Sequence, residues 1–170
     1  MVRRNLLGLT LAALVLVSSK AEAQSRPVSG GDDASVLASA GLTFLNQSSS
    51  TGVGVAANVL FNTLTTTDTG RIGIVGDIGF NHSDGATVGT FMGGARYTFT
   101  TSGKVAPYGQ FLAGFVHCCG TTHFDPAIGF GLDVAWRPQV NFRGEIQFIF
   151  DDANATRFFF GVSLPINKKR

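Results

Sequence analysis

The chain has 170 residues, which is enough for one domain of ordinary size. It contains 15 Phe and 22 Gly, and charged residues make up only 14% of it, against roughly 25% in typical soluble domains. Many aromatic residues with few charges exclude a disordered chain, because disordered chains are charge-rich and aromatic-poor. The sequence has no basic stripe, so we expect no nucleic acid among its partners.

The first 23 residues have the three parts of a secretory signal peptide. Arg3 and Arg4 form a basic start, Leu6–Val17 is an apolar run, and Ala21–Ala23 has the small-x-small pattern that signal peptidase reads. The apolar run is shorter than the about 20 residues that a membrane-spanning helix needs, which disfavours an uncleaved anchor. We therefore expect a signal peptide over residues 1–23 and, after cleavage, a flexible periplasmic leader over residues 24–34.

Cleavage would also remove the net charge. The formal charge is +2, and residues 1–23 hold three basic residues and one acidic residue, so ten of each sign remain. A neutral mature chain has no long-range attraction for an acidic partner. No later stretch reaches 18 uninterrupted apolar residues, so we expect no second helical span.

Residues 35–166 are dominated by a period of two, which places alternate side chains on opposite faces of β-strands. The clearest case is Val140–Phe150, where apolar residues alternate with Asn141, Arg143, Glu145 and Gln147. In Val105–Val116 both faces are apolar, so the sequence does not orient that strand. The segments that separate the eight strands are turn-rich: 46–51, 65–70, 81–85, 100–104, 118–126, 137–139 and 151–156. They are too short for crossover helices, so we expect an antiparallel sheet.

The polar face of these strands indicates on which side of the sheet lipid lies. It is poor in Lys and Glu and rich in Gly, Ala, Ser and Thr, which suits a narrow, filled interior better than a soluble exterior. The charges within the strands have both signs, so they could pair with one another inside: Asp77, Arg96, Asp133, Arg143 and Glu145. An Arg facing lipid at mid-membrane would cost about 2–4 kcal/mol. An open edge in lipid would leave backbone groups unpaired. The sequence thus predicts an all-β fold, a closed antiparallel eight-stranded up-and-down transmembrane β-barrel.

The last strand carries a family resemblance. Gly161, Leu164 and Ile166 follow the spacing Gly-x-x-apolar-x-aromatic, with Ile166 in place of the aromatic residue and a basic C-terminal tail over residues 167–170 beyond it. Over residues 35–166 the chain resembles the small eight-stranded outer-membrane β-barrel proteins of Gram-negative bacteria, a porin-like group. The resemblance implies that these three residues are the signal for the barrel-assembly machinery. It also implies a place in the outer membrane, outer-membrane lipids as partners, and both termini in the periplasm.

This prediction favours a structural or membrane-supporting role, without catalysis, cofactor or metal, and with an interior filled by side chains rather than an open pore. Two alternatives stay open. An outer-membrane lipid-modifying enzyme would need His, Ser and an acid on one face near the rim. His82, Ser83 and Asp84 supply the residue types, but adjacent strand residues face opposite ways. A soluble periplasmic small-ligand-binding β-barrel would have an apolar lumen instead.

One predicted external loop gathers metal-ligating residue types: His117, Cys118, Cys119, His123 and Asp125. Adjacent Cys side chains point apart, and zinc sites usually have the spacing Cys-x2–4-Cys, so we expect no metal site here. A disulfide between Cys118 and Cys119, or a bridge to another chain, remains open in an oxidising compartment.

Overall fold

The computed structural model describes residues 36–47, 50–67, 69–83, 85–137, 139–150 and 154–166. The expected signal peptide (1–23), leader (24–34) and basic tail (167–170) lie outside these residues. None of the described residues form a helix long and apolar enough to cross a membrane.

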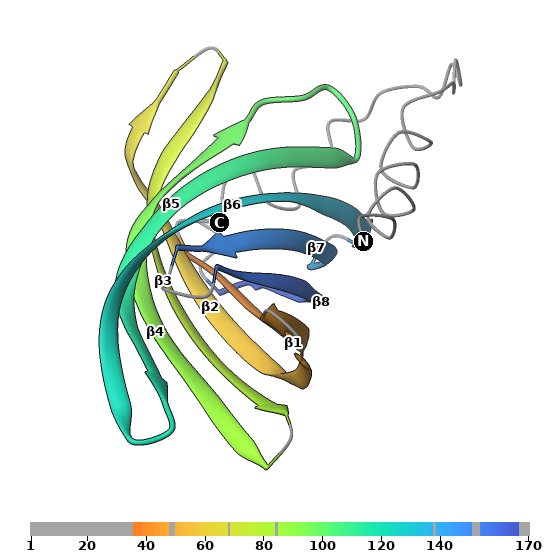
Figure 1. Ribbon diagram of the computed structural model, residues 1–170. Helices are drawn as coiled ribbons and strands as arrows, with labels where there is room; N and C mark the ends of the chain where they lie inside the picture. Colours follow the sequence, from red (N-terminus) through yellow and green to blue (C-terminus); the bar gives the residue numbers. More distant parts are fainter. Residues whose placement is uncertain are drawn as a thin grey trace, which may run out of the picture.

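Eight antiparallel strands close into a barrel (Figure 1). Each strand pairs with its neighbours in the sequence, and β1 pairs with β8 to complete the ring. The predicted closed up-and-down architecture is thereby confirmed. The strands are β1 (Val36–Gln47), β2 (Ser50–Thr66), β3 (Gly70–Ser83), β4 (Ala86–Phe99), β5 (Val105–Cys118), β6 (Thr121–Arg137), β7 (Val140–Ile149) and β8 (Ala155–Pro165).

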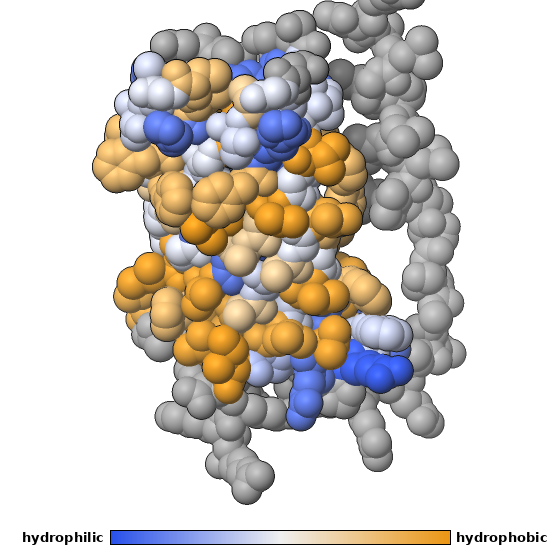
Figure 2. Space-filling model, turned by 90° about the horizontal axis from the view of Figure 1, so that it is seen from below, coloured by the Kyte–Doolittle hydropathy of each residue, from blue (hydrophilic) through white to orange (hydrophobic). Residues whose placement is uncertain are grey.

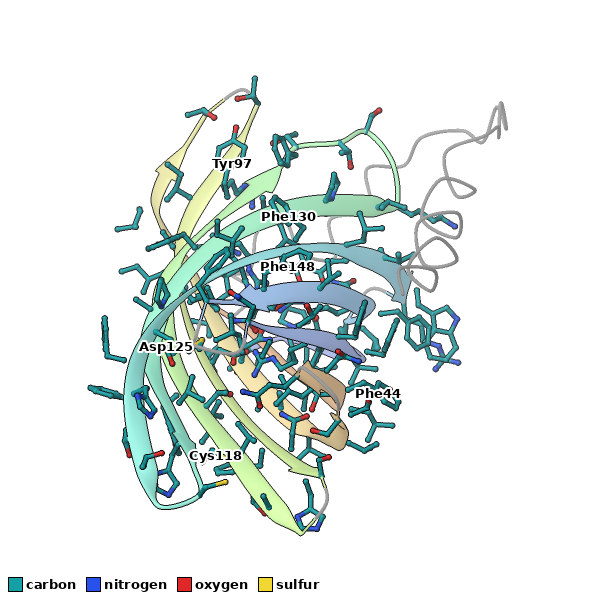
Figure 3. The ribbon with its side chains drawn as sticks, in the orientation of Figure 1. Phe44, Tyr97, Cys118, Asp125, Phe130 and Phe148 are labelled. Carbon is teal, nitrogen blue, oxygen red and sulfur yellow. The ribbon has the colours of Figure 1, made fainter. Side chains whose placement is uncertain are left out.

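The two ends of the barrel differ. At the terminal end, β1 begins and β8 ends, and the connections β2–β3, β4–β5 and β6–β7 lie beside them. The tip end carries the hairpins β1–β2, β3–β4, β5–β6 and β7–β8. Tyr97 and Cys118, toward opposite ends in Figure 3, mark the terminal end and the tip end respectively.

The large apolar side chains face outward. Phe111, Phe130 and Phe160 are each more than half exposed, and they belong to a set of exposed large hydrophobic residues from all eight strands. The face in Figure 2 is mostly orange across its middle, with blue residues gathered toward the two ends. So much exposed apolar surface would be unfavourable in water and is the lipid-facing band of a transmembrane barrel.

The alternation predicted for seven strands has the expected orientation, with apolar residues out and polar residues in. The structure also orients β5, which the sequence left open. Tyr108, Gln110 and Leu112 face the lumen, whereas Phe111 and Phe115 face outward. The polar groups of Tyr108 and Gln110 therefore distinguish the inward face of β5 from its outward face.

Aromatic pairs lie toward both ends of the apolar band. Tyr97 packs edge-on against Phe99, with ring centroids 4.8 Å apart, at the terminal end. Trp136 also packs there, against Phe142, and the Arg137 guanidinium lies 4.6 Å from the Trp136 ring centroid. The pairs Phe80–Phe91 and Phe115–Phe124 lie toward the tip end. Such girdles are typical of the two membrane interfaces of a transmembrane barrel.

The strands extend further at the tip end than the sequence predicted. The turn expected over 118–126 is wrong, because β5 runs to Cys118 and β6 begins at Thr121. Only Cys119 and Gly120 form the turn, with φ of 56° and 80°, the left-handed pair that a tight two-residue hairpin requires. The turns expected over 46–51 and 81–85 likewise include strand residues. At the tip end the strands continue beyond the apolar band with polar residues. The sequence of these strand ends therefore resembles that of a loop.

The seam between β1 and β8 depends on two glycines. Gly41 lies opposite Gly161 across this seam. A Cβ atom on Gly41 would overlap the carbonyl oxygen of Phe160, and one on Gly161 would overlap that of Ala40. The last ladder of the ring therefore closes at this distance only with glycine at both positions.

Substitution of this seam should destabilise the barrel. We expect Gly161→Ala to lower the free energy of unfolding by about 1–3 kcal/mol, as overpacking does. Gly144→Ala is the matched control, because an added Cβ there meets no atom within 4 Å. Urea unfolding after refolding in detergent micelles measures both without the assembly machinery, which separates packing from any role of Gly161 in an assembly signal. Equal stability of the two variants would contradict the packing argument.

Candidate functional site: a charge-paired lumen

Of the buried charged side chains that the structure describes in the lumen, six form three ion pairs. Arg96 pairs with Glu145, Arg143 with Asp133, and Arg157 with Asp77. All six residues are less than 9% exposed. A buried charge is tolerated only when it is paired and hydrogen bonded, so the three pairs are a condition for this interior.

Arg143 on β7 organises the pair nearest the terminal end. Its Nε and Nη2 donate to the two carboxylate oxygens of Asp133 at 2.8 and 2.6 Å, and its Nη1 donates to Asn58 Oδ1 on β2 at 2.6 Å. Ser163 Oγ donates to Asp133 Oδ1 at 3.1 Å, and Ser39 Oγ donates to Ser163 Oγ at 2.9 Å. The two-pronged contact fixes the guanidinium plane. Together these hydrogen bonds link five strands, namely β1, β2, β6, β7 and β8.

Glu145 gathers a second group of donors. Tyr108 Oη donates to Glu145 Oε2 at 2.6 Å, and Gln110 Nε2 donates to Glu145 Oε1 at 2.8 Å. Arg96 donates from Nε and Nη2 to Gln110 Oε1 at 2.8 and 2.6 Å and lies 3.6 Å from Glu145. The amide of Gln110 therefore relays the interaction between the guanidinium and the carboxylate.

The Tyr108 ring joins these two groups. The Arg96 guanidinium carbon lies 4.0 Å from the ring centroid, and that of Arg143 lies 5.2 Å from it. Both distances are within the range of a cation–π interaction. One aromatic ring thus accompanies two cations that would otherwise repel each other in a narrow space.

Arg157 on β8 forms the third pair, nearer the tip end. Its Nη2 donates to Asp77 Oδ1 on β3 at 2.5 Å, and its Nη1 donates to Thr90 Oγ1 on β4 at 2.9 Å. In a ring of eight strands, β4 is diametrically opposite β8. The Arg157 side chain therefore crosses the whole lumen.

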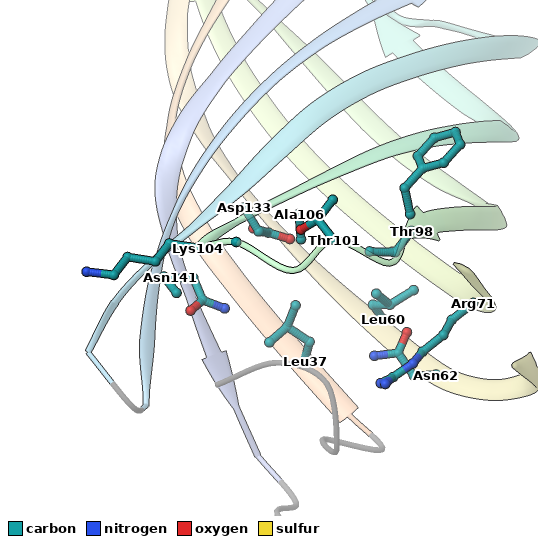
Figure 4. A pocket seen from close by; sticks show the side chains of 13 residues that line it. Leu37, Leu60, Asn62, Arg71, Thr98, Thr101, Lys104, Ala106, Asp133 and Asn141 are labelled. Carbon is teal, nitrogen blue, oxygen red and sulfur yellow. The ribbon is translucent and has the colours of Figure 1, made fainter. Parts of the chain in front are cut away.

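The two ends of the lumen are closed differently. Toward the tip end the buried apolar side chains are Leu45, Val88, Val116, Ile149 and Ala155. They are part of a larger apolar cluster that extends along the lumen to Leu37 and Leu60. At the terminal end a pocket remains, with Arg71 and Lys104 on opposite margins in Figure 4 and Asp133 and Asn141 also lining it. The polar interior thus meets solvent at the terminal end, and at the tip end it meets these apolar side chains and the buried Asp125.

The structure brings Asp133 together with Arg143, and Arg96 with Glu145, and it places Asp77 in the third pair. Sequence reasoning missed Arg157, Tyr108 and Gln110. Arg157 lies on the face of its strand that the alternation predicts to be inward, so its position in the alternation could have identified it as a lumenal residue. Tyr108 and Gln110 lie on the strand that the sequence did not orient.

The metal-ligating residue types at the β5–β6 hairpin do not converge. His117 faces outward, where its Nδ1 lies 2.8 Å from Thr122 Oγ1, whereas His123 and Asp125 share the inward parity of β6. Within the described residues, no group of three or more His, Cys, Asp or Glu side chains is placed to hold a metal ion. The strand pairing that replaces the expected loop is the reason for this separation.

Cys118 and Cys119 are free thiols at the turn, with their Sγ atoms 2.7 Å apart. Cys118 lies beyond Phe115, the last outward aromatic residue of β5. Its hydrogen bond to Cys119, with partial burial, raises the pKa of the Cys118 thiol above its ordinary value. A raised pKa reduces the thiolate fraction and hence the reactivity toward oxidants.

His82 and Ser83 do not form a catalytic pair. His82 is exposed on the outer face of β3, and its Nδ1 lies 3.1 Å from Thr87 Oγ1 on β4. Ser83 follows it with the opposite parity, and Asp84 lies outside the described residues. The histidine is therefore engaged by a threonine across the hairpin.

The three residues predicted as an assembly signal lie at the end of β8. Leu164 and Ile166 are exposed on the outer face, and the Ile166 amide donates to the Val36 carbonyl at 3.0 Å. Gly161 is a seam residue opposite Gly41. Their role in assembly stays a prediction.

Loss of one partner of a lumenal pair should destabilise the protein. Arg143→Leu would leave Asp133 buried without its two-pronged partner, and we expect the free energy of unfolding to fall by about 3–5 kcal/mol. Arg143→Leu with Asp133→Leu should recover part of that loss, because no charge is left unpaired. The exposed Arg137→Leu is the control, with an expected change below about 1 kcal/mol. An unchanged urea midpoint for Arg143→Leu would count against the network.

The cysteine pair should remain reduced. The Cα atoms of adjacent residues are about 3.8 Å apart, closer than the roughly 4.4–6.8 Å usual for a disulfide. We expect the purified protein to have the same mass with and without reductant, and both thiols to react with a maleimide in the unreduced protein. A gain of two hydrogens on reduction would instead show a bond between Cys118 and Cys119.

Comparison with known proteins identifies solved structures that have the same fold. No protein-family model matches the chain, and no curated protein matches its sequence. Among solved structures, Ail, the attachment invasion locus protein of Yersinia pestis, matches with a TM-score of 0.58 and 12% identity over 78% of this chain and 98% of Ail. The outer membrane protein OprG from Pseudomonas aeruginosa matches with a TM-score of 0.53 and 10% identity over 76% of this chain and 94% of OprG.

A de novo designed transmembrane β-barrel also matches, with a TM-score of 0.51 and 14% identity over 77% of this chain and 95% of the design. Identities this low show a shared fold alone. Together with the closed ring and the apolar exterior, they establish that the chain is an eight-stranded transmembrane β-barrel with the fold of the small outer-membrane barrel proteins.

Proposed function

We propose that the chain is an integral outer-membrane barrel with a structural, membrane-supporting role and a lumen that does not conduct solutes. The observation that carries this proposal is the bridge from Arg157 on β8 to Thr90 on β4, with a donor–acceptor distance of 2.9 Å. A side chain bonded to the diametrically opposite strand leaves no continuous water column at its level.

Other lumenal contacts support the same conclusion at other heights. Arg143 on β7 reaches Asn58 on β2, three strands away in the ring. Gln147 on β7 donates to the sulfur of Met92 on β4 at 3.4 Å. An eight-stranded barrel is wide enough to be filled by its own side chains but not to hold an aqueous channel as well.

The apolar layer at the tip end is a second barrier. An ion that entered the terminal-end pocket near Asp133 would still have to pass Leu45, Val88 and Ile149. Transfer of a charge through an apolar layer is strongly unfavourable. The pocket is therefore a vestibule rather than the entrance of a conduit.

The two alternative functions have weaker support. The described residues place His82 against Thr87, so the structure does not support the His82–Ser83 pair that the enzyme hypothesis needs. A soluble ligand-binding barrel would have an apolar lumen and a polar exterior, whereas this barrel has an apolar exterior and three ion pairs in its lumen. A place in the outer membrane is supported by the fold, the expected signal peptide and the resemblance of the last strand.

Single-channel recording in a planar lipid bilayer tests the proposal. We expect the refolded protein to insert without stable conductance steps. Arg157→Ser with Arg143→Ser removes two lumenal bridges and should raise ion leakage if the protein still folds, as judged by heat-modifiable migration in a gel. Arg137→Ser, outside the lumen, should stay silent. Uniform, stable conductance steps from the unmodified protein would overturn the proposal.

A further inference from the structure

Three hairpins of the tip end carry an outward-facing polar pair at the same place. In each, a side chain with a ring or amide nitrogen faces a threonine five residues later across the hairpin. The nitrogen-to-oxygen distances are 3.2, 3.1 and 2.8 Å in turn, and all six side chains are exposed: Asn46–Thr51, His82–Thr87 and His117–Thr122. A repeat of this kind in hairpins of unrelated local sequence indicates a shared environment.

An apolar pair lies directly below each polar pair, one step closer to the middle of the membrane on the same outer face. These pairs are Phe44–Val53, Phe80–Gly89 and Phe115–Phe124. Phe115 and Phe124 are 54% and 65% exposed, so the apolar band is still open to lipid at this height. The polar pairs therefore lie where hydrocarbon gives way to headgroups.

Two of the polar pairs form one row, which we call the imidazole row: His82, Thr87, His117 and Thr122. His117 lies opposite Gly89 on β4, and Gly89 is two residues from Thr87 on the same face. The row therefore runs over four consecutive strands, β3 to β6, with an offset of one step in the strand pairing, because His117 and Thr122 are level with Gly89 in the register. The Phe80–Phe91 and Phe115–Phe124 rings form an apolar shelf beside and below the row, with centroids 5.7 and 5.5 Å apart within the pairs. Phe80 is level with His117 in the register, and the other three rings lie one step closer to the middle of the membrane.

The imidazole row retains donors for a ligand. Each ring uses Nδ1 for its threonine, and Nε2 has no hydrogen bond to the part of the chain that the structure describes. Where the threonine hydroxyl donates to Nδ1, Nε2 carries the hydrogen and is itself a donor, and a protonated ring donates there as well. Every acidic residue described on β3 to β6 (Asp77, Asp125, Asp133) faces the lumen. An anion at the row meets none of these carboxylates.

We propose that the imidazole row binds the phosphate group of a membrane lipid whose acyl chain lies on the Phe80–Phe91 and Phe115–Phe124 shelf. The proposal rests on the proposed membrane location and extends it to a defined partner. The hydrogen-bond donors of the imidazole row lie next to an exposed apolar shelf. An amphiphile can bind both, with its phosphate on the donors and its acyl chain on the shelf, whereas free phosphate can bind only the donors. An imidazole N–H is also a suitable hydrogen-bond donor to a lipid phosphate oxygen, and a hydrogen bond to a charged acceptor is stronger than one between neutral groups.

The three histidines of the chain supply a direct test with an internal control. The full protein, with isotope-labelled histidine, is refolded in uncharged detergent micelles and titrated with dihexanoyl phosphatidic acid while the imidazole NMR signals are followed. We expect saturable shifts of His82 and His117, assigned by single His→Ala variants. His123, which has the inward parity of β6, should not shift.

Affinity measurements on variants complete the test. His82→Ala with His117→Ala should bind phosphatidic acid roughly tenfold more weakly or worse, because two hydrogen bonds to a charged group are lost. His123→Ala should bind as the unmodified protein does, and heat-modifiable migration checks that all variants fold. Failure of the row to shift, or equal shifts with uncharged diacylglycerol or with inorganic phosphate at the same concentration, would overturn the proposal. Conductance would be unaffected by any of these outcomes, so the proposed function is tested separately.

Discussion

The pairing of β1 with β8 is the constraint on which the rest of this structure depends. In lipid no water can satisfy a free backbone N–H or C=O, so the sheet must have no edge. Closure of only eight strands creates a narrow interior that side chains can fill. Inward positions must then be glycine, as at Gly41 and Gly161, or side chains that satisfy one another, as Arg143 and Asp133 do.

The alternation of apolar and polar residues along each strand was enough to predict most of the fold from the sequence. A period of two can be read from single residues such as Arg143 and Glu145, because lipid outside and close packing inside leave few residue types acceptable on either face. The alternation is less clear where one of these two constraints weakens. In β5 the inward face carries Leu112 and Val116 as well as Gln110, and beyond the apolar band at the tip end polar strand residues resemble a loop.

The pairings inside the lumen are harder to predict than the faces. Parity places Arg157 inside, but which acid it meets depends on strand tilt and on the reach of its side chain across the ring to β3 and β4. Neither quantity is a local property of the sequence. Tyr108 is the clearest example, because its ring contacts Arg96 and Arg143, which belong to two other strands.

A designed barrel shares this fold, so the fold by itself carries no function. Within the apolar band, lipid on one face and close packing on the other leave little freedom for distinctive chemistry. All three histidines and both cysteines of the chain lie instead at the tip end, past the outermost aromatic pairs or beside them. Neither constraint holds there, yet His82 and His117 occupy equivalent positions and engage threonines in the same way. The same His–Thr contact thus recurs at positions where neither lipid nor close packing restricts the residue type. Such a repeat points to a requirement other than folding. The environment that the two positions share is the headgroup layer.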